Sequence, residues 1–255
     1  MASAAREASI DAGRVLGRAF ETLKANFLLF YVIAILLAGL PGFFNAYLAY
    51  AHDDTTDPNP YLSIEYWGSL LGWFLGIALL QAVLARATIL HLSGRRQDPA
   101  GSVMLVLRLL PPLTGLSFYV LFLILIGLIC LIIPGIMIYC ALMVVVPALV
   151  EERRGLMGSI DRSRELTRGS RFQIFLVALL FWIFSFVISG VVGVISGDPW
   201  WSTAPSPNPL LSAAADGFAA SLNELICAVT IATLYVELRE VKEGAGAEQL
   251  TGVFG

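Results

Sequence analysis

Residues 172–195, FQIFLVALLFWIFSFVISGVVGVI, contain no charged side chain. At 1.5 Å per residue, a helix of this length covers about 36 Å, which exceeds the roughly 30 Å hydrocarbon core of a bilayer. The stretch is therefore predicted to be a transmembrane helix. Further apolar runs extend this to an all-α, polytopic membrane protein with six transmembrane helices. The predicted spans are 27–50, 66–90, 113–133, 135–150, 172–195 and 213–236.

The composition of the whole chain agrees with a membrane protein. Of its 255 residues, 58% are hydrophobic and 14% are charged, and the mean hydropathy is +0.80. Soluble domains carry roughly 25% charged residues, and so few charges would leave large apolar patches on a soluble surface. This argues against a soluble enzyme, a nucleic-acid-binding protein and a disordered chain.

The positions of the basic residues predict the topology. All 16 Lys and Arg residues lie outside the two polar segments 51–65 and 196–212. Cytoplasmic loops hold the Lys and Arg excess, so both segments are expected outside and both termini in the cytoplasm. The predicted organisation is a cytoplasmic amphipathic segment at 1–26, a six-helix membrane domain at 27–236 and a cytoplasmic tail at 237–255.

The first 26 residues also bear on the location of the protein. They lack the short apolar stretch and the cleavage site of a signal peptide, so the first span is expected to act as an uncleaved anchor. The use of 14 Arg against 2 Lys indicates a bacterial gene. The expected location is the bacterial plasma (inner) membrane.

The pair of apolar runs at 113–150 has two interpretations. Basic residues precede and follow it, so the chain must return to the cytoplasmic side. A tight outer turn at Pro134–Gly135 would join two full spans, because proline cannot continue the preceding helix and glycine tolerates turn geometry. The alternative is a re-entrant pair buried against other helices.

Each predicted hairpin follows a cytoplasmic segment that can form an interfacial helix. In the first segment, apolar residues recur at the spacing of one helix face, and basic residues occupy the other positions. This pattern is expected of a helix that lies against anionic headgroups. We therefore expect three modules, each an interfacial helix followed by a transmembrane hairpin. The apolar stripe is Leu16, Phe20, Leu23 and Phe27; the basic residues are Arg14, Arg18 and Lys24; the other segments are 100–108 and 151–171.

Four stretches of the chain resemble a bacterial family of multipass proteins, named for the membrane domain of glycerophosphoryl diester phosphodiesterase. They are GRVLGRAFETLKANF at 13–27, IPGI at 133–136, VPALVE at 146–151 and GSIDRSRELTRG at 158–169. The similarity extends over about residues 9–236 and implies a six-helix membrane domain. In the namesake, a separate soluble domain carries catalysis. Its histidine and carboxylate constellation has no counterpart here, so the resemblance does not imply phosphodiesterase activity.

The sequence carries little that would support an enzyme. The two histidines, His52 and His91, are predicted on opposite sides of the membrane, where they cannot share a metal site or a dyad. The motifs HExxH, GxSxG and GxxxxGK are absent. We therefore expect no enzyme activity, no cofactor and no metal, with an intramembrane enzyme as a distant alternative.

Polar residues inside the spans are the strongest candidates for function, because a charge at the bilayer centre costs about 2.5–3.5 kcal/mol on insertion scales. Glu224 and its neighbour Asn223 lie deep in the last span, and Gln81 lies at a matching depth in the second. One interpretation is a proton or cation site at Glu224, with Asn223 and Gln81 as hydrogen-bonding partners. The other is a set of interhelical contacts that only hold the bundle together.

Two further groups of residues have a structural and a functional interpretation. Gly68, Gly72 and Gly76 share one helix face and are expected to pack closely against a neighbouring helix, either within the monomer or across a dimer. The basic segment 151–171 is predicted to contact anionic lipid or a cytosolic partner, unless its charge serves topology alone. The residues proposed for that contact are Arg162, Arg164 and Arg168.

These observations favour a non-catalytic membrane module that acts as a partner or scaffold in envelope or lipid-linked processes. The alternative is a small-solute or ion transporter with Glu224 as its intramembrane site. The expected partners are the lipid bilayer and a membrane or cytosolic protein, with no nucleic acid. The sequence does not indicate an oligomeric state.

Overall fold

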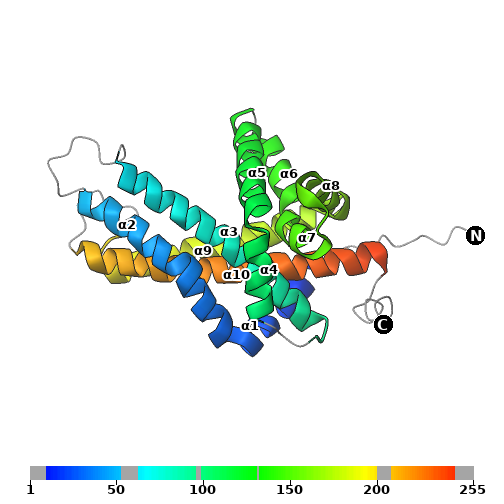
Figure 1. Ribbon diagram of the computed structural model, residues 1–255, viewed down its shortest axis with the longest axis horizontal. Coiled ribbons are helices and arrows are strands. Elements are labelled where there is room, and N and C mark those ends of the chain that lie inside the picture. The colour runs from blue at the N-terminus through cyan, green and yellow to red at the C-terminus, as the bar shows by residue number, and fades with distance from the viewer. Residues whose placement is uncertain (1–9, 53–62, 96–98, 131, 200–207, 245–255) are drawn as a thin grey trace, which may run out of the picture.

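The computed structural model describes residues 10–52, 63–95, 99–130, 132–199 and 208–244 (Figure 1). Within these ranges the regular secondary structure is helical throughout. Six helical segments are long and apolar enough to cross a membrane, as the sequence predicted. Parts of the two predicted outer segments, 53–62 and 200–207, lie outside the described residues.

The chain forms ten α-helices and one π-helical turn in the described ranges. In chain order they are α1 (Ala12–Ala34), the π-helix η1 (Ile35–Gly39), α2 (Leu40–His52), α3 (Ile64–Leu92), α4 (Pro99–Arg108), α5 (Leu110–Cys130), α6 (Ile132–Leu142), α7 (Val145–Glu152), α8 (Gly155–Thr167), α9 (Arg171–Ser196) and α10 (Pro209–Glu243).

Side-chain caps set several of the helix ends. Asp11 caps α1 by accepting from the Gly13 and Arg14 amides, Ser63 caps α3, and Asn208 caps α10 with Pro209 in the first turn. These are the residue types that satisfy the free N–H groups of a first turn.

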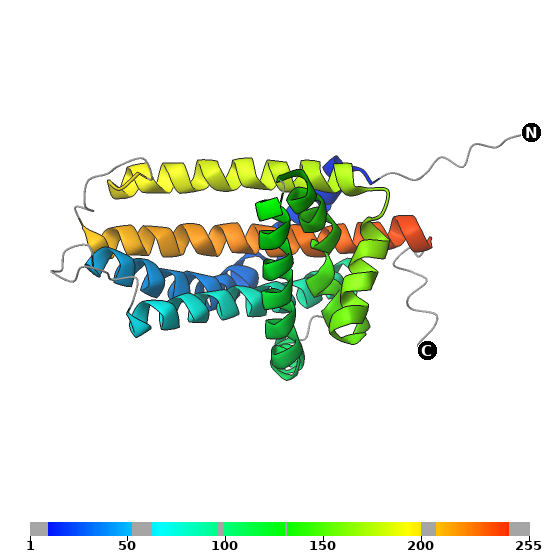
Figure 2. The ribbon, with the colours of Figure 1, turned by 90° about the horizontal axis from the view of Figure 1, so that it is seen from above.

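Helix α10 is the centre of the membrane domain. It contacts α1, α2, α3 and α9, and in Figure 2 it lies between α9 on one side and α2 with α3 on the other. Its first half is rich in alanine, serine and glycine, which lets neighbouring backbones approach closely. At the closest point Gly217 meets Gly39 of η1: a Cβ atom at Gly217 would lie 2.7 Å from the Gly39 carbonyl oxygen.

The first helical segment runs antiparallel to α10. Arg18, near its start, contacts Glu237 near the end of α10 at 2.7 Å. Tyr50, near its end, donates a hydrogen bond to Asp216 near the start of α10 at 2.8 Å. Helix α1 departs from helical geometry at Asn26, with φ −125° and ψ 17°. This kink divides α1 into two helical stretches, and it coincides with the predicted boundary between the amphipathic segment and the first span.

The region 113–150 differs from the sequence prediction. Helix α5 ends at Cys130 and α6 begins at Ile132, so Pro134 and Gly135 lie in the first turn of α6 rather than forming the turn itself. Proline is tolerated there because the first-turn N–H groups have no intrahelical partner. Gly135 instead permits close packing, since a Cβ atom at Gly127 of α5 would lie 2.9 Å from the Gly135 Cα.

Helices α5 and α6 also have an unexpected direction. In both views α5 runs across α10 rather than along it (Figures 1 and 2). The second predicted span of this pair, 135–150, is divided between α6 and α7, with the break at Met143–Val144.

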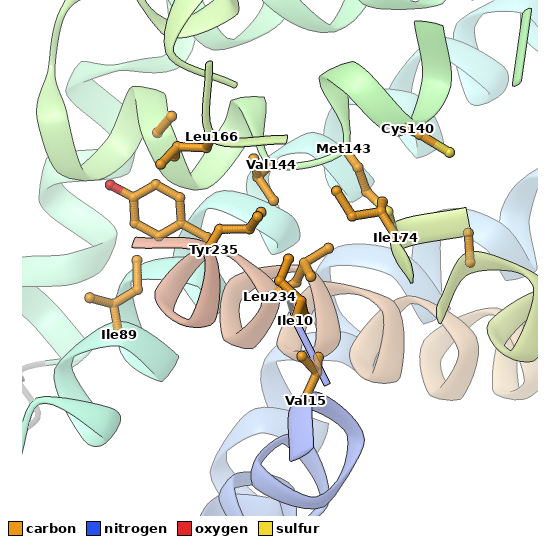
Figure 3. Close-up of a cluster of buried hydrophobic side chains, with 13 residues drawn as sticks. Ile10, Val15, Ile89, Cys140, Met143, Val144, Leu166, Ile174, Leu234 and Tyr235 are labelled. Carbon is orange, nitrogen blue, oxygen red and sulfur yellow. The ribbon is translucent and has the colours of Figure 1, made fainter. Parts of the chain in front are cut away.

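A buried apolar cluster joins α6, α8, α9 and α10 near the C-terminal end of α10 (Figure 3). Leu234 and Tyr235 of α10 are fully buried in it, together with Ile174 of α9 and Leu166 of α8. The cluster holds the short helix α8 against the long helices. It therefore positions the charged side chains that lie around it.

Candidate functional site

The polar residues predicted inside the membrane come together between α3 and α10. Gln81 of α3 lies close enough to interact with the Glu224 carboxyl group of α10. Asn223 precedes Glu224 on the same helix. Among the described residues no Lys or Arg forms an ion pair with Glu224. This includes Arg86, which lies further along α3.

Two acceptor oxygens in this cluster have no hydrogen-bond partner within the part of the chain that the structure describes. They are Oε2 of Glu224 and Oδ1 of Asn223, and both atoms are buried. Buried polar atoms in proteins are nearly always hydrogen-bonded, so each exception requires an explanation. Each of these two oxygens can therefore accept a further hydrogen bond.

A pocket of about 230 Å³ adjoins this cluster. Its polar lining comes from four helices: Gln81 of α3, Ser117 of α5, Tyr139 of α6 and Cys227 of α10. Cys227 follows Glu224 by three residues and Asn223 by four, so all three side chains lie on one face of α10.

Tyr139 and Cys227 were not predicted as site residues. The position of Cys227 on the Glu224 face could have been recognised from helical spacing, whereas that of Tyr139 depends on the tertiary packing of α6. Cys140 is also a free cysteine, but its side chain is buried in the apolar cluster of Figure 3 rather than in this pocket.

A second cluster of charges surrounds Arg162 of α8. Its side chain is only 8% exposed and pairs with Glu152 at 2.8 Å, with Glu165 at 3.0 Å and with Glu243 of α10. Burial alone would lower the pKa of the Arg162 guanidinium, but the hydrogen bonds to Glu152 and Glu165 outweigh it and raise the pKa. Tyr235 also donates to Glu152, at 2.9 Å. Arg162 is thus engaged within the chain.

The other two basic residues of the predicted lipid contact have different positions. Arg164 and Arg168 are exposed. The backbone carbonyl oxygen of Arg168 accepts a hydrogen bond from Lys242 at 2.7 Å. This contact does not involve the Arg168 side chain, which stays at the surface. Of the three predicted residues, these two present their side chains to the surroundings.

Arg14 and Arg18 of α1 pair with α10 rather than standing free on the amphipathic segment. Glu237 is fully buried; it forms an ion pair with Arg14 at 2.8 Å and accepts a hydrogen bond from Arg18 at 2.7 Å. Glu240 accepts Arg18 as well, at 2.8 Å. The sequence interpretation, in which these arginines face lipid headgroups, did not anticipate this pairing because it joins residues more than 200 positions apart.

The apolar stripe of α1 lines a groove between α1, α9 and α10. The groove has a volume of about 710 Å³, and its walls are almost entirely apolar. Phe181 and Phe184 of α9 face the stripe across it, and Lys24 is its one charged lining residue among those described. The lining from α1 is Leu16, Ala19, Phe20, Leu23, Lys24 and Phe27.

Only one of the three predicted packing glycines meets a neighbour. A Cβ atom at Gly76 would overlap the Leu37 carbonyl oxygen of η1. Cβ atoms at Gly68 and Gly72 would meet no atom of the described chain within 4 Å. Close packing within the chain therefore falls on Gly76, at the end of the stripe.

Comparisons with known proteins add no family or function to these observations. No family model, no curated protein and no solved structure matches the chain. Within the described residues, no group of three or more His, Cys, Asp or Glu side chains is placed to hold a metal ion. The helices of the described residues indicate the class: a multipass membrane protein with a polar cluster between two of its long helices.

Proposed function

We propose that the protein is a non-catalytic module of the bacterial inner membrane that acts as a partner or scaffold in lipid-linked processes of the envelope. Its termini are cytoplasmic, and its helices form three hairpins, of which the middle one, α5 with α6, is re-entrant. The residues that resemble the membrane domain of glycerophosphoryl diester phosphodiesterase support this proposal. The absence of basic residues from 51–65 and 196–212 supports the orientation.

The groove between α1, α9 and α10 is the observation that carries this function. Its occupant is the acyl chain of an anionic phospholipid, because the walls are apolar and Lys24 supplies a positive charge beside them. A lysine can bury its carbon stem along an apolar surface while its ammonium reaches a headgroup. Arg164 and Arg168, exposed on α8, are proposed as further contacts of anionic lipid or of a cytosolic partner.

A lipid carrying a photoactivatable group on its acyl chain tests this function. Leu23→Trp would fill the groove and should lower the crosslinking yield several-fold, whereas Leu28→Trp, on the same helix but outside the groove, should leave it unchanged. Lys24→Gln should reduce the preference for anionic over zwitterionic lipid. Equal crosslinking to the unsubstituted protein, Leu23→Trp and Leu28→Trp would contradict the proposal.

A small-solute or ion transporter is the second candidate. It is favoured by the two unpartnered acceptor oxygens of Glu224 and Asn223 beside a pocket. Glu224→Gln should abolish flux through proteoliposomes, because it removes the charge and keeps the shape. A flux that survives this substitution unchanged would exclude Glu224 as the transport site.

A further inference from the structure

We propose that the first part of α1, residues 12–25, is a hinged gate for the lipid groove between α1, α9 and α10. The segment turns at Asn26, and ion pairs from Arg18 to the end of α10 hold it closed. This inference rests on the lipid-binding function proposed above and adds how the lipid enters and leaves. The juxtaposition that carries it is a kink at one end of a groove wall and a cluster of ion pairs at the other.

The kink supplies a point at which α1 can bend. Asn26 departs from helical backbone angles, and its side-chain amide donates to the Thr22 carbonyl oxygen at 3.1 Å. The Thr22 hydroxyl in turn donates to the Arg18 carbonyl oxygen at 2.8 Å. Side chains that bond to the carbonyl groups of the preceding turn bend helices at defined positions. Residues 12–25 can therefore change direction while the rest of α1 stays in place.

The two parts of α1 are held by different interactions. After the kink, Phe30 is fully buried in an apolar cluster with Leu80 of α3. Before the kink, the buried residues of α1 are Val15, Ala19 and Thr22, whose side chains are smaller. The free energy of apolar burial grows with the area removed from water. The part before the kink therefore depends more on its ion pairs than the part after it.

Arg18 is the centre of those ion pairs. Its guanidinium donates to both carboxylate oxygens of Glu240, at 2.8 and 3.1 Å, and to Glu237 at 2.7 Å. Bidentate contacts of this kind fix the orientation of the two groups as well as their distance. The side chains of Arg18 and Glu240 are 28% and 25% exposed, so water can solvate both charges as they separate. Glu237 is paired only with Arg14 and Arg18 in the described chain, both on the moving segment, so opening admits water to its carboxylate as well.

The segment before the kink carries most of the α1 wall of the groove. Leu16, Phe20 and Leu23 line the groove from this segment, and the Phe20 side chain is 68% exposed. A turn of the segment away from α9 and α10 widens the groove, and its return encloses an acyl chain between apolar walls. Lys24 lies next to the kink and moves least, so its ammonium remains available to the headgroup while the gate opens.

The distance between two spin labels measures this movement without reference to lipid. One label is placed at Gly17→Cys, on an open face of the segment, and the other at Phe172→Cys, exposed at the start of α9. In the full-length protein in lipid nanodiscs, with the labelled unsubstituted chain as background, Arg18→Gln should add a component of longer distance. Arg108→Gln, which removes an exposed arginine of α4, should leave the distances unchanged. Unchanged distances in Arg18→Gln would overturn the gate.

Lipid exchange then shows what the gate controls. A phospholipid with a photoactivatable acyl chain should enter the groove several-fold faster in Arg18→Gln than in the unsubstituted protein. Arg18→Cys with Glu240→Cys, joined by a bis-methanethiosulfonate reagent, should slow entry several-fold relative to the unsubstituted chain treated alike, and a reductant should restore it. Equal rates in the released and the joined proteins would overturn the gate. Movement of the spin labels without crosslinking of any lipid would instead contradict the proposed function and leave the hinge in α1 standing.

Discussion

Two carboxylates on α10 show how differently one residue type is used in this protein. Glu237 is fully buried and forms ion pairs with Arg14 and Arg18, whereas no Lys or Arg of the described chain forms an ion pair with Glu224. A buried charge that is paired contributes to a defined packing, while an unpaired one lowers stability unless a ligand or proton satisfies it. The first is a structural residue and the second is the candidate for function.

The role of Glu237 leads to a prediction about stability. Glu237→Gln leaves two arginines with one fewer partner and should lower the free energy of unfolding by about 3 kcal/mol, the range for breaking a buried ion pair. Glu165→Gln removes a partner of Arg162, but Glu165 is 68% exposed, so the loss should stay below about 1 kcal/mol. Thermal unfolding in detergent measures both, and equal losses would contradict the assignment.

At the scale of helices, the sequence predicted the positions of the apolar segments better than their packing. Apolar runs are read directly from composition, and four of the six predicted spans, 27–50, 66–90, 172–195 and 213–236, lie wholly within helical segments of the structure. Two features were not foreseen: Pro134 and Gly135 have the residue types of a turn and yet lie in α6, and 135–150 is divided between α6 and α7. Likewise Glu224 and Gln81 were placed at matching depth by counting residues, while Tyr139 joined the site only through tertiary packing.

The three glycines of α3 lead to a prediction that distinguishes the glycine in close contact with a neighbouring helix from the two that are not. Gly76→Ala should strongly destabilise the protein, because its Cβ atom would overlap the Leu37 backbone, which cannot move without displacing η1. Gly68→Ala and Gly72→Ala meet open space in the described chain and should be neutral or stabilising by up to about 1 kcal/mol, the helix propensity gained over glycine. Expression level and thermal unfolding measure the three variants. A destabilised Gly68→Ala protein would indicate that this face packs against a second molecule.

At the scale of the whole molecule, the helix ends gather at two opposite ends of the bundle. Arg18 meets Glu237 at one end of the bundle, and Tyr50 meets Asp216 at the other. The basic residues of α1, α8 and the end of α10 gather at the first end, which is the cytoplasmic end if Lys and Arg excess sets the orientation. The pair α5–α6 belongs to neither group, because it runs across the bundle (Figure 1).

Cysteine accessibility tests this arrangement with three positions, each exposed on the described chain. A membrane-impermeant maleimide should label Glu65→Cys in intact cells and Arg164→Cys only after lysis, because the two lie at opposite ends of the bundle. Ile133→Cys, at the start of α6, should react under neither condition if the pair turns back within the bilayer, since a re-entrant tip remains in hydrocarbon. The unsubstituted chain, with Cys130, Cys140 and Cys227, supplies the background. Labelling of Ile133→Cys in intact cells would instead establish two full crossings by α5 and α6, and labelling of Arg164→Cys there would reverse the proposed orientation.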